Sequence, residues 1–135
     1  MKKLKLLRKV IDFYTISISN NLYLYSNFFY ELRIMDKRIV PLSISPFIYE
    51  NYIIKISPNA CPRILQFIKY CYKLDLINKT RIFNFLNYTF DEDGDLKIDS
   101  DVYPGCIYIK HNQIPLFIRI LEDVIKIKNE YEKSI

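Results

Sequence analysis

The stretch that decides the fold of this chain is YCYKLDLINKTRIFNFLNYTFDEDGDLKIDSDVYPGCIYIKHNQIPLFIRILEDVIKIKNEY, residues 70–131. Apolar or aromatic residues alternate with polar ones in four segments of it, which is typical of β-strands. These segments are residues 70–76, 81–90, 96–102 and 106–110. Turn-forming residues separate them: Asn78-Lys79, the acidic run Asp91–Asp95, and Pro104-Gly105. Gly94 can take the positive φ that a tight acidic turn requires.

A long amphipathic helix is predicted after the fourth strand, from about Asn112 to Glu132. Its apolar residues recur at helical spacing and should form one buried face. They are Ile114, Phe117, Ile118, Leu121, Val124 and Ile125. Four strands followed by this helix predict an α+β fold, in which a curved antiparallel sheet has the long C-terminal amphipathic helix packed on one face.

The chain of 135 residues is expected to form a single domain, with a four-strand-plus-helix core over residues 65–135 and an extension over residues 1–60. Five cations interleave with apolar residues in Met1–Tyr14, which predicts a basic amphipathic helix. Such a helix would lie on the protein's own core, on an anionic membrane or on nucleic acid. Further elements are expected upstream of the core: strands at residues 22–25, 28–35 and 38–43, a strand or short helix within 47–56, and a short helix from Pro62 to Tyr70. The sheet would then have six or seven strands, and we detect no internal repeat.

The composition excludes several classes of protein. The two glycines do not occur in a phosphate-binding loop motif, so the common nucleotide-binding enzymes are excluded. The three cysteines form no C-x-x-C pair, and their odd number favours a reducing intracellular compartment, the cytoplasm or nucleus. No segment is long and apolar enough to span a bilayer.

No catalytic or metal site is expected. Asp91, Asp93 and Asp95 alternate as in a calcium loop, but Thr89 and Ser100 stand where such a loop needs carboxylates. We therefore interpret the acidic run as a solvated hairpin tip. The single histidine, His111, has no partners at metal-ligand spacing, and no nucleophile lies beside a candidate base. The sequence predicts a protein that is not an enzyme and has no cofactor.

Three segments carry a resemblance to a known family. They are Ile82–Tyr88, an apolar strand ending in an aromatic residue; Asp91–Lys97, an acidic glycine turn followed by a lysine; and Gly105–Ile109 with Gln113, a strand leading into a helix. This order resembles the DNA-binding domain of the positive-cofactor-four family of transcriptional coactivators. The resemblance implies a curved four-stranded sheet with a dimerising helix, and binding of single-stranded DNA. The chain departs from the family at Leu86, Thr89 and residues 97–104, where the family has an arginine, a second aromatic residue and a basic segment.

The resemblance and the aromatic content predict a non-catalytic, transcription-associated protein that binds single-stranded DNA or RNA. One face of the expected strand 81–90 would carry Phe83 and Phe85 beside Arg81, and the other would pack under the helix. The candidate base-stacking residues are Phe83, Phe85 and Tyr88, and the candidate phosphate contacts are Lys79, Arg81 and Lys97. The resemblance further implies a homodimer through the C-terminal helix.

Charge is distributed unevenly and leaves a second function open. Residues 1–90 have a net charge of +9 and residues 91–135 a net charge of −4, which together give the +5 of the whole chain. A bipolar chain is a weaker signal for nucleic acid than a uniformly basic one. The alternative is a small protein-binding inhibitor or immunity factor from a virus or mobile element.

Overall fold

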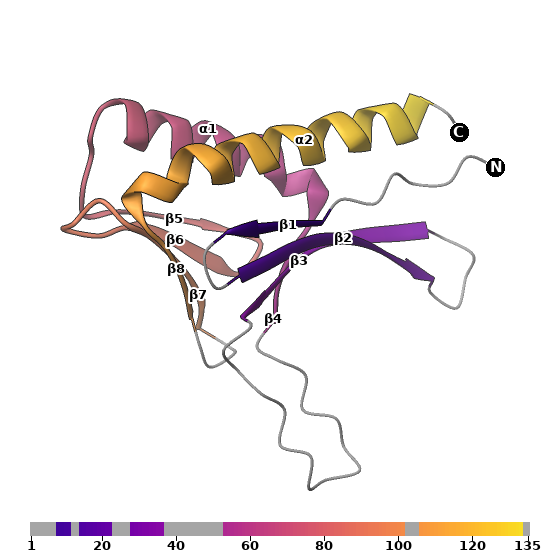
Figure 1. Ribbon diagram of the computed structural model, residues 1–135, viewed down its shortest axis with the longest axis horizontal. Coiled ribbons are helices and arrows are strands. Elements are labelled where there is room, and N and C mark those ends of the chain that lie inside the picture. Colours follow the sequence, from indigo (N-terminus) through magenta and orange to yellow (C-terminus); the bar gives the residue numbers. More distant parts are fainter. Residues whose placement is uncertain (1–7, 12–13, 23–27, 37–52, 102–105, 134–135) are drawn as a thin grey trace, which may run out of the picture.

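The computed structural model describes residues 8–11, 14–22, 28–36, 53–101 and 106–133, and it contains two antiparallel four-stranded sheets and two helices (Figure 1). The first sheet has the order β1-β2-β3-β4, and its strands are β1 Arg8–Ile11, β2 Tyr14–Leu22, β3 Phe28–Asp36 and β4 Ile53–Ile56. A 3₁₀ turn, η1 Pro58–Ala60, leads into α1 Cys61–Lys73. The second sheet has the order β5-β6-β7-β8, with β5 Lys79–Phe83, β6 Leu86–Phe90, β7 Leu96–Ser100 and β8 Cys106–Ile109. A second 3₁₀ turn, η2 His111–Gln113, leads into α2 Ile114–Lys133.

The two halves of the chain repeat the same unit, a four-stranded meander followed by a 3₁₀ turn and a helix. The repeat is also present in the sequence around each turn, where four residues recur 53 positions later. Ile54, Ile56, Asn59 and Pro62 correspond to Ile107, Ile109, Asn112 and Pro115. The expectation of no internal repeat is therefore wrong. So is the single sheet of six or seven strands, because the strands divide into two sheets of four.

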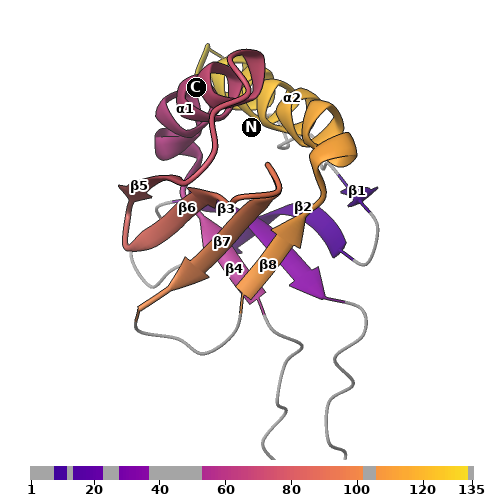
Figure 2. The ribbon, with the colours of Figure 1, turned by 90° about the vertical axis from the view of Figure 1, so that its left-hand side faces the viewer.

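The core lies between the two helices and one face of each sheet (Figure 2). In the first sheet, Ile16, Ile34 and Ile54 are paired across three strands and are all buried. The two helices bury equivalent positions 53 residues apart: Cys61, Ile64, Ile68 and Cys71 in α1, and Ile114, Phe117, Leu121 and Val124 in α2. The predicted α+β class is confirmed, with the 20-residue α2 packed on the sheets as expected.

Residues 70–76 do not form the predicted strand. α1 continues through Lys73, and Leu74 and Asp75 form a turn. α1 extends one turn beyond the predicted helix Pro62–Tyr70, because Ile68 and Cys71 continue its buried face at helical spacing. Tyr70 and Tyr72, whose alternation with other residues suggests a strand in the sequence, therefore lie on the last turn of α1.

Residues 81–90 form a hairpin instead of one strand. β5 and β6 are joined by a two-residue turn at Asn84 and Phe85, whose φ angles of 48° and 68° are both positive. Such a turn pairs Arg81 with Tyr88 and Phe83 with Leu86. Paired residues share a face, so Arg81 and Phe83 lie on the same side as the buried Tyr88 and not on the opposite face.

The N-terminal predictions are tested in part. Residues 8–11 form β1 and Tyr14 begins β2, so the predicted helix over Met1–Tyr14 is wrong there, while residues 1–7 and 12–13 lie outside the described residues. The strand predicted at 28–35 is confirmed as β3, but its partner is β2. The strands predicted at 22–25 and 38–43 lie almost wholly outside the described residues. Of residues 47–56, the described part is the strand β4. No helix in the described part of the chain meets the length and hydropathy needed to cross a membrane.

Candidate functional site

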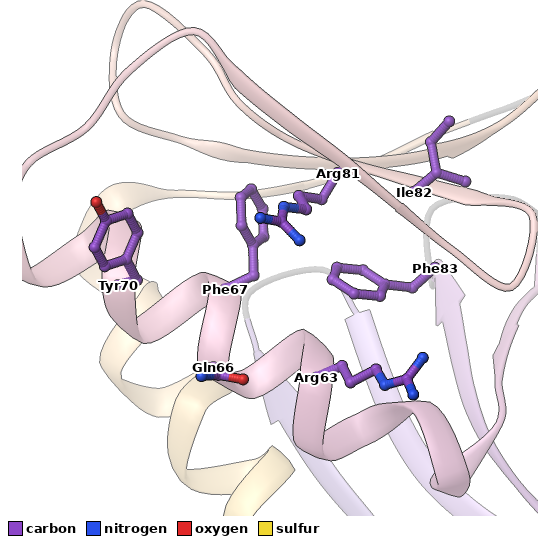
Figure 3. Close-up of a pocket in the computed structure, with 7 residues that line it drawn as sticks. All are labelled: Arg63, Gln66, Phe67, Tyr70, Arg81, Ile82 and Phe83. Carbon is purple, nitrogen blue, oxygen red and sulfur yellow. The ribbon is translucent and has the colours of Figure 1, made fainter.

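A groove of about 650 Å³ runs between α1 and β5 (Figure 3). Its lining comes from both elements: Arg63, Gln66, Phe67 and Tyr70 from α1, and Arg81, Ile82 and Phe83 from β5. Arg81 and Phe83 extend from β5 toward α1, whereas the side chain of Ile82 points away. The groove therefore lies on the helix side of the second sheet, at its outer edge.

Helical and strand periodicity together position these side chains. Arg63, Phe67 and Tyr70 are spaced by four and three residues, which places them on one face of α1. Arg81 and Phe83 are two residues apart and so share a face of β5. Because β5 is the terminal strand of its sheet, no further strand covers this edge among the described residues.

Aromatic rings connect the groove to the core. The ring centroids of Phe67 and Phe83 are 6.2 Å apart, and those of Phe83 and Tyr88 are 5.6 Å apart at an interplanar angle of 69°. Phe67 also lies edge-on to Phe90, with centroids 5.9 Å apart. Phe67 and Phe83 are half-buried, so these rings are held by packing and present only part of their surface to the groove. Tyr70 is 59% exposed and is free to contact a ligand.

The groove is basic. Residues 61–83 contain Arg63, Lys69, Lys73, Lys79 and Arg81, against one acid, Asp75. Lys69 pairs with Glu122, but neither Arg63 nor Arg81 makes an ion pair with any described residue. Lys79 and Arg81 also influence the nearby Cys71 thiol. Burial raises the pKa of this thiol, and the positive charges of Lys79 and Arg81 oppose that shift. An anionic ligand would therefore supply the charge that the groove lacks.

The six site residues predicted from the sequence are not brought together. Arg81 and Phe83 line the groove, and Lys79 begins the same strand. Tyr88 is completely buried, and within the described part of the chain its hydroxyl has no hydrogen-bond partner. It is a core residue, and the prediction that it stacks bases is wrong.

Phe85 and Lys97 are not among the residues that line the groove. Phe85 is in the hairpin turn and is 83% exposed. Lys97 is on the opposite face of the sheet, where its ammonium is 3.8 Å from a carboxylate oxygen of Asp99 and 6.0 Å from the centre of the Tyr108 ring. Asp99 therefore already neutralises part of the Lys97 charge. Lys97 also lies on the other face of the sheet from the basic groove.

Sequence reasoning missed the contribution of α1. Arg63, Phe67 and Tyr70 are not among its candidates, although all three fall within the helix that it predicts from Pro62 to Tyr70. Their spacing of four and three residues was the available signal. That signal places residues on one face of a helix, but it does not reveal that β5 lies opposite.

The acidic turn is explained by its own hydrogen bonds. One carboxylate oxygen of Asp91 accepts the backbone N–H groups of Asp93 and Asp95 at 2.9 and 3.0 Å. Gly94 has the positive φ expected, 79°, and Asp95 accepts the backbone N–H of His111 at 2.8 Å. The carboxylates of Asp91, Asp93 and Asp95 lie within 4.8 Å of one another. Their role in the turn is sufficient to account for the cluster.

No protein-family model matches this chain, and comparison with curated proteins gave no match either. The groove is the feature from which a function can be argued. Guanidinium groups can bind phosphates through two parallel hydrogen bonds, and exposed aromatic rings can stack on planar ligands.

Proposed function

We propose that this protein is a non-catalytic, transcription-associated protein that binds single-stranded DNA or RNA in the groove between α1 and β5. One observation carries the proposal: Arg63 and Arg81, which have no acidic partner among the described residues, flank a groove lined by aromatic rings. Phosphates attract cations, and bases stack on aromatic faces. A polymer that alternates phosphates with planar bases meets both requirements.

A single strand fits these features better than a duplex. The bases of a single strand can leave their neighbours and expose their faces, whereas those of a duplex are stacked and paired. Tyr70, which is 59% exposed, is the most accessible ring of the groove lining. Base stacking on such a ring contributes about 1 to 3 kcal/mol. Phe67 and Phe83, fixed by their contacts with each other and with Tyr88 and Phe90, would present preorganised edges.

The repeated unit supports the family resemblance. The resemblance implies a dimer in which each subunit is one unit, a curved four-stranded sheet and a helix, and the two helices pair. Here one chain contains two such units, and their helices pack against each other. The apolar face of α2 is therefore already covered inside one chain, and a homodimer would have to use another part of the helix. The free thiols of Cys61 and Cys71 support a reducing intracellular compartment.

The proposal is tested by the salt dependence of binding. Fluorescence anisotropy with a labelled oligothymidylate of about 16 nucleotides should show binding at low salt that weakens as salt is added. Arg63→Ala and Arg81→Ala should each reduce the slope of log K against log salt by about 0.7. Tyr70→Ala should weaken binding and leave that slope unchanged.

Arg119→Ala is the matched control, since it removes an exposed arginine from α2, outside the groove lining. Each variant must keep the circular dichroism spectrum of the parent protein. If Arg119→Ala changes the slope as much as Arg81→Ala, the charge effect is general and the groove is not the site. If the parent protein binds neither single strands nor duplex at low salt, the protein-binding inhibitor becomes the better reading.

A further inference from the structure

We infer that Phe85 is a wedge that stacks on an unpaired base at the end of the groove. This inference rests on the proposed function and adds how the site selects single strands. Phe85 is the second residue of the two-residue turn between Phe83 and Leu86. A turn with two positive φ angles is of type I′, and its second position strongly favours glycine.

Phe85 is an exception among the residues that adopt positive φ. The other described non-glycine residues with this conformation are Asp75, Asn78 and Asn84, with φ of 51°, 55° and 48°. Asp and Asn tolerate the left-handed region because their side chains can hydrogen-bond locally. A phenylalanine has no such compensation, so the φ of 68° at Phe85 is strained.

The ring is also exposed to water. At 83%, Phe85 is the most exposed large apolar side chain among the described residues. The strain opposes folding, the exposed ring gives little burial in return, and a glycine would remove the strain. Strained backbone conformations of this kind are concentrated at functional sites of proteins. The Phe85 ring is therefore a candidate contact for a ligand.

The position of the turn and the charge near it indicate the class of that ligand. Phe83 lines the groove and is followed directly by the turn, so Phe85 stands at the end of the strand that carries Arg81. Lys79 and Arg81 make no ion pair with any described residue, and this charge favours a polyanion over an apolar peptide. A base beyond the groove could then stack on Phe85 while phosphates farther along the same strand of nucleic acid contact Arg81 and Lys79.

Phe85→Gly tests the wedge because its two effects should have opposite signs. The melting temperature should rise by about 2 to 5 °C, since glycine fits the turn without strain. Affinity for oligothymidylate should fall about fivefold or more, with an unchanged salt slope. In an oligonucleotide carrying 2-aminopurine, the fluorescence change on binding should be reduced at the stacked position.

Phe85→Tyr keeps a ring and should keep the affinity of the parent protein. Tyr108→Ala removes an exposed ring from the opposite face and should leave binding unchanged. If Phe85→Gly binds as tightly as the parent, the wedge is overturned and the groove proposal stands. A lower melting temperature would also overturn it, because glycine would then relieve no strain at this turn. If the parent protein itself does not bind, the proposed function fails, and the wedge fails with it.

Discussion

Lys69 of α1 and Glu122 of α2 occupy equivalent positions in the two repeats, 53 residues apart, and they contact each other. The Lys69 Nζ lies 3.7 Å from the Glu122 Oε2. Equivalent residues meet where a two-fold axis passes, and the two helices run antiparallel side by side (Figures 1 and 2). The two repeats are thus related by a local two-fold axis through the helix pair. Both side chains are about half exposed, at 53% and 50%, so the ion pair itself adds little stability.

We predict one nucleic-acid site per chain, despite the two repeats. α2 contacts β1 as α1 contacts β5, but it has Leu116, Ile120 and Asp123 at the positions of Arg63, Phe67 and Tyr70. The second position therefore lacks the arginine and both rings, and gains an acid. Titration of a short oligothymidylate at protein concentrations well above Kd should saturate at one strand per chain.

The same substitutions can be copied into α1. A variant with Arg63→Leu and Tyr70→Asp gives α1 the residues of α2 at these positions and should lose most of the binding. Saturation at two strands per chain, or unchanged binding by this variant, would show that the difference between the repeats has no role in recognition.

Leu121→Ala should destabilise the protein by about 2 to 5 kcal/mol, because the side chain is completely buried between α2 and the sheets. Urea unfolding followed by circular dichroism measures this free energy. Leu116→Ala is the control on the same helix, where the side chain is 37% exposed and the expected loss is well below that of Leu121→Ala. Equal losses for the two variants would contradict the assigned buried face.

Tyr14→Phe should cost about 1 to 2 kcal/mol of stability. The Tyr14 hydroxyl on β2 accepts a hydrogen bond of 3.0 Å from the backbone N–H of Tyr108 on β8, which links the two sheets. Tyr14 is 2% exposed, so water cannot easily replace the lost partner. Tyr70→Phe, the same change at an exposed position, should leave the melting temperature unchanged. A melting temperature of Tyr14→Phe equal to that of the parent would mean that the link between the sheets is not energetically important.

Stability should fall as pH rises above about 9, where thiols of the unfolded chain ionise. Burial raises the pKa of the Cys61 thiol to about 12, with Lys128 opposing the shift. Between the unfolded pKa of 9.0 and the folded value, the unfolded state has lost a proton that the folded state keeps, so alkaline pH favours unfolding. The expected loss is about 1.4 kcal/mol per pH unit for this group. Urea unfolding from pH 8 to 11 measures it.

Two variants separate the contributing groups. Cys61→Ala should flatten the decline that begins near pH 9. Burial also raises the pKa of Tyr88, so Tyr88→Phe should flatten the part above about pH 10. At neutral pH, Tyr88→Phe should be neutral or stabilising, because the buried hydroxyl has no partner among the described residues. A decline that is the same in both variants as in the parent would contradict these assignments.

The sequence by itself determined the elements whose signals are local. The spacing of Ile114, Phe117, Leu121 and Val124 specifies α2, and Asp91 with Gly94 specifies the acidic turn. These signals come from residues at most four positions apart, where helix and turn contacts are made. The count of four strands before this helix is right only because two errors cancel: residues 70–76 are helix and turn, and residues 81–90 form two strands.

Only the tertiary structure decided the hairpin at Asn84 and Phe85, the repeat and the groove. A phenylalanine at the second turn position hides the turn, since the aromatic alternation continues through it. The repeat has few identical residues, and burial at equivalent positions of α1 and α2 makes it evident. The groove joins Arg63 to Arg81 only because α1 packs over the edge of the second sheet. That packing depends on core contacts between residues far apart in the chain, such as Phe67 with Phe90, which no local pattern encodes.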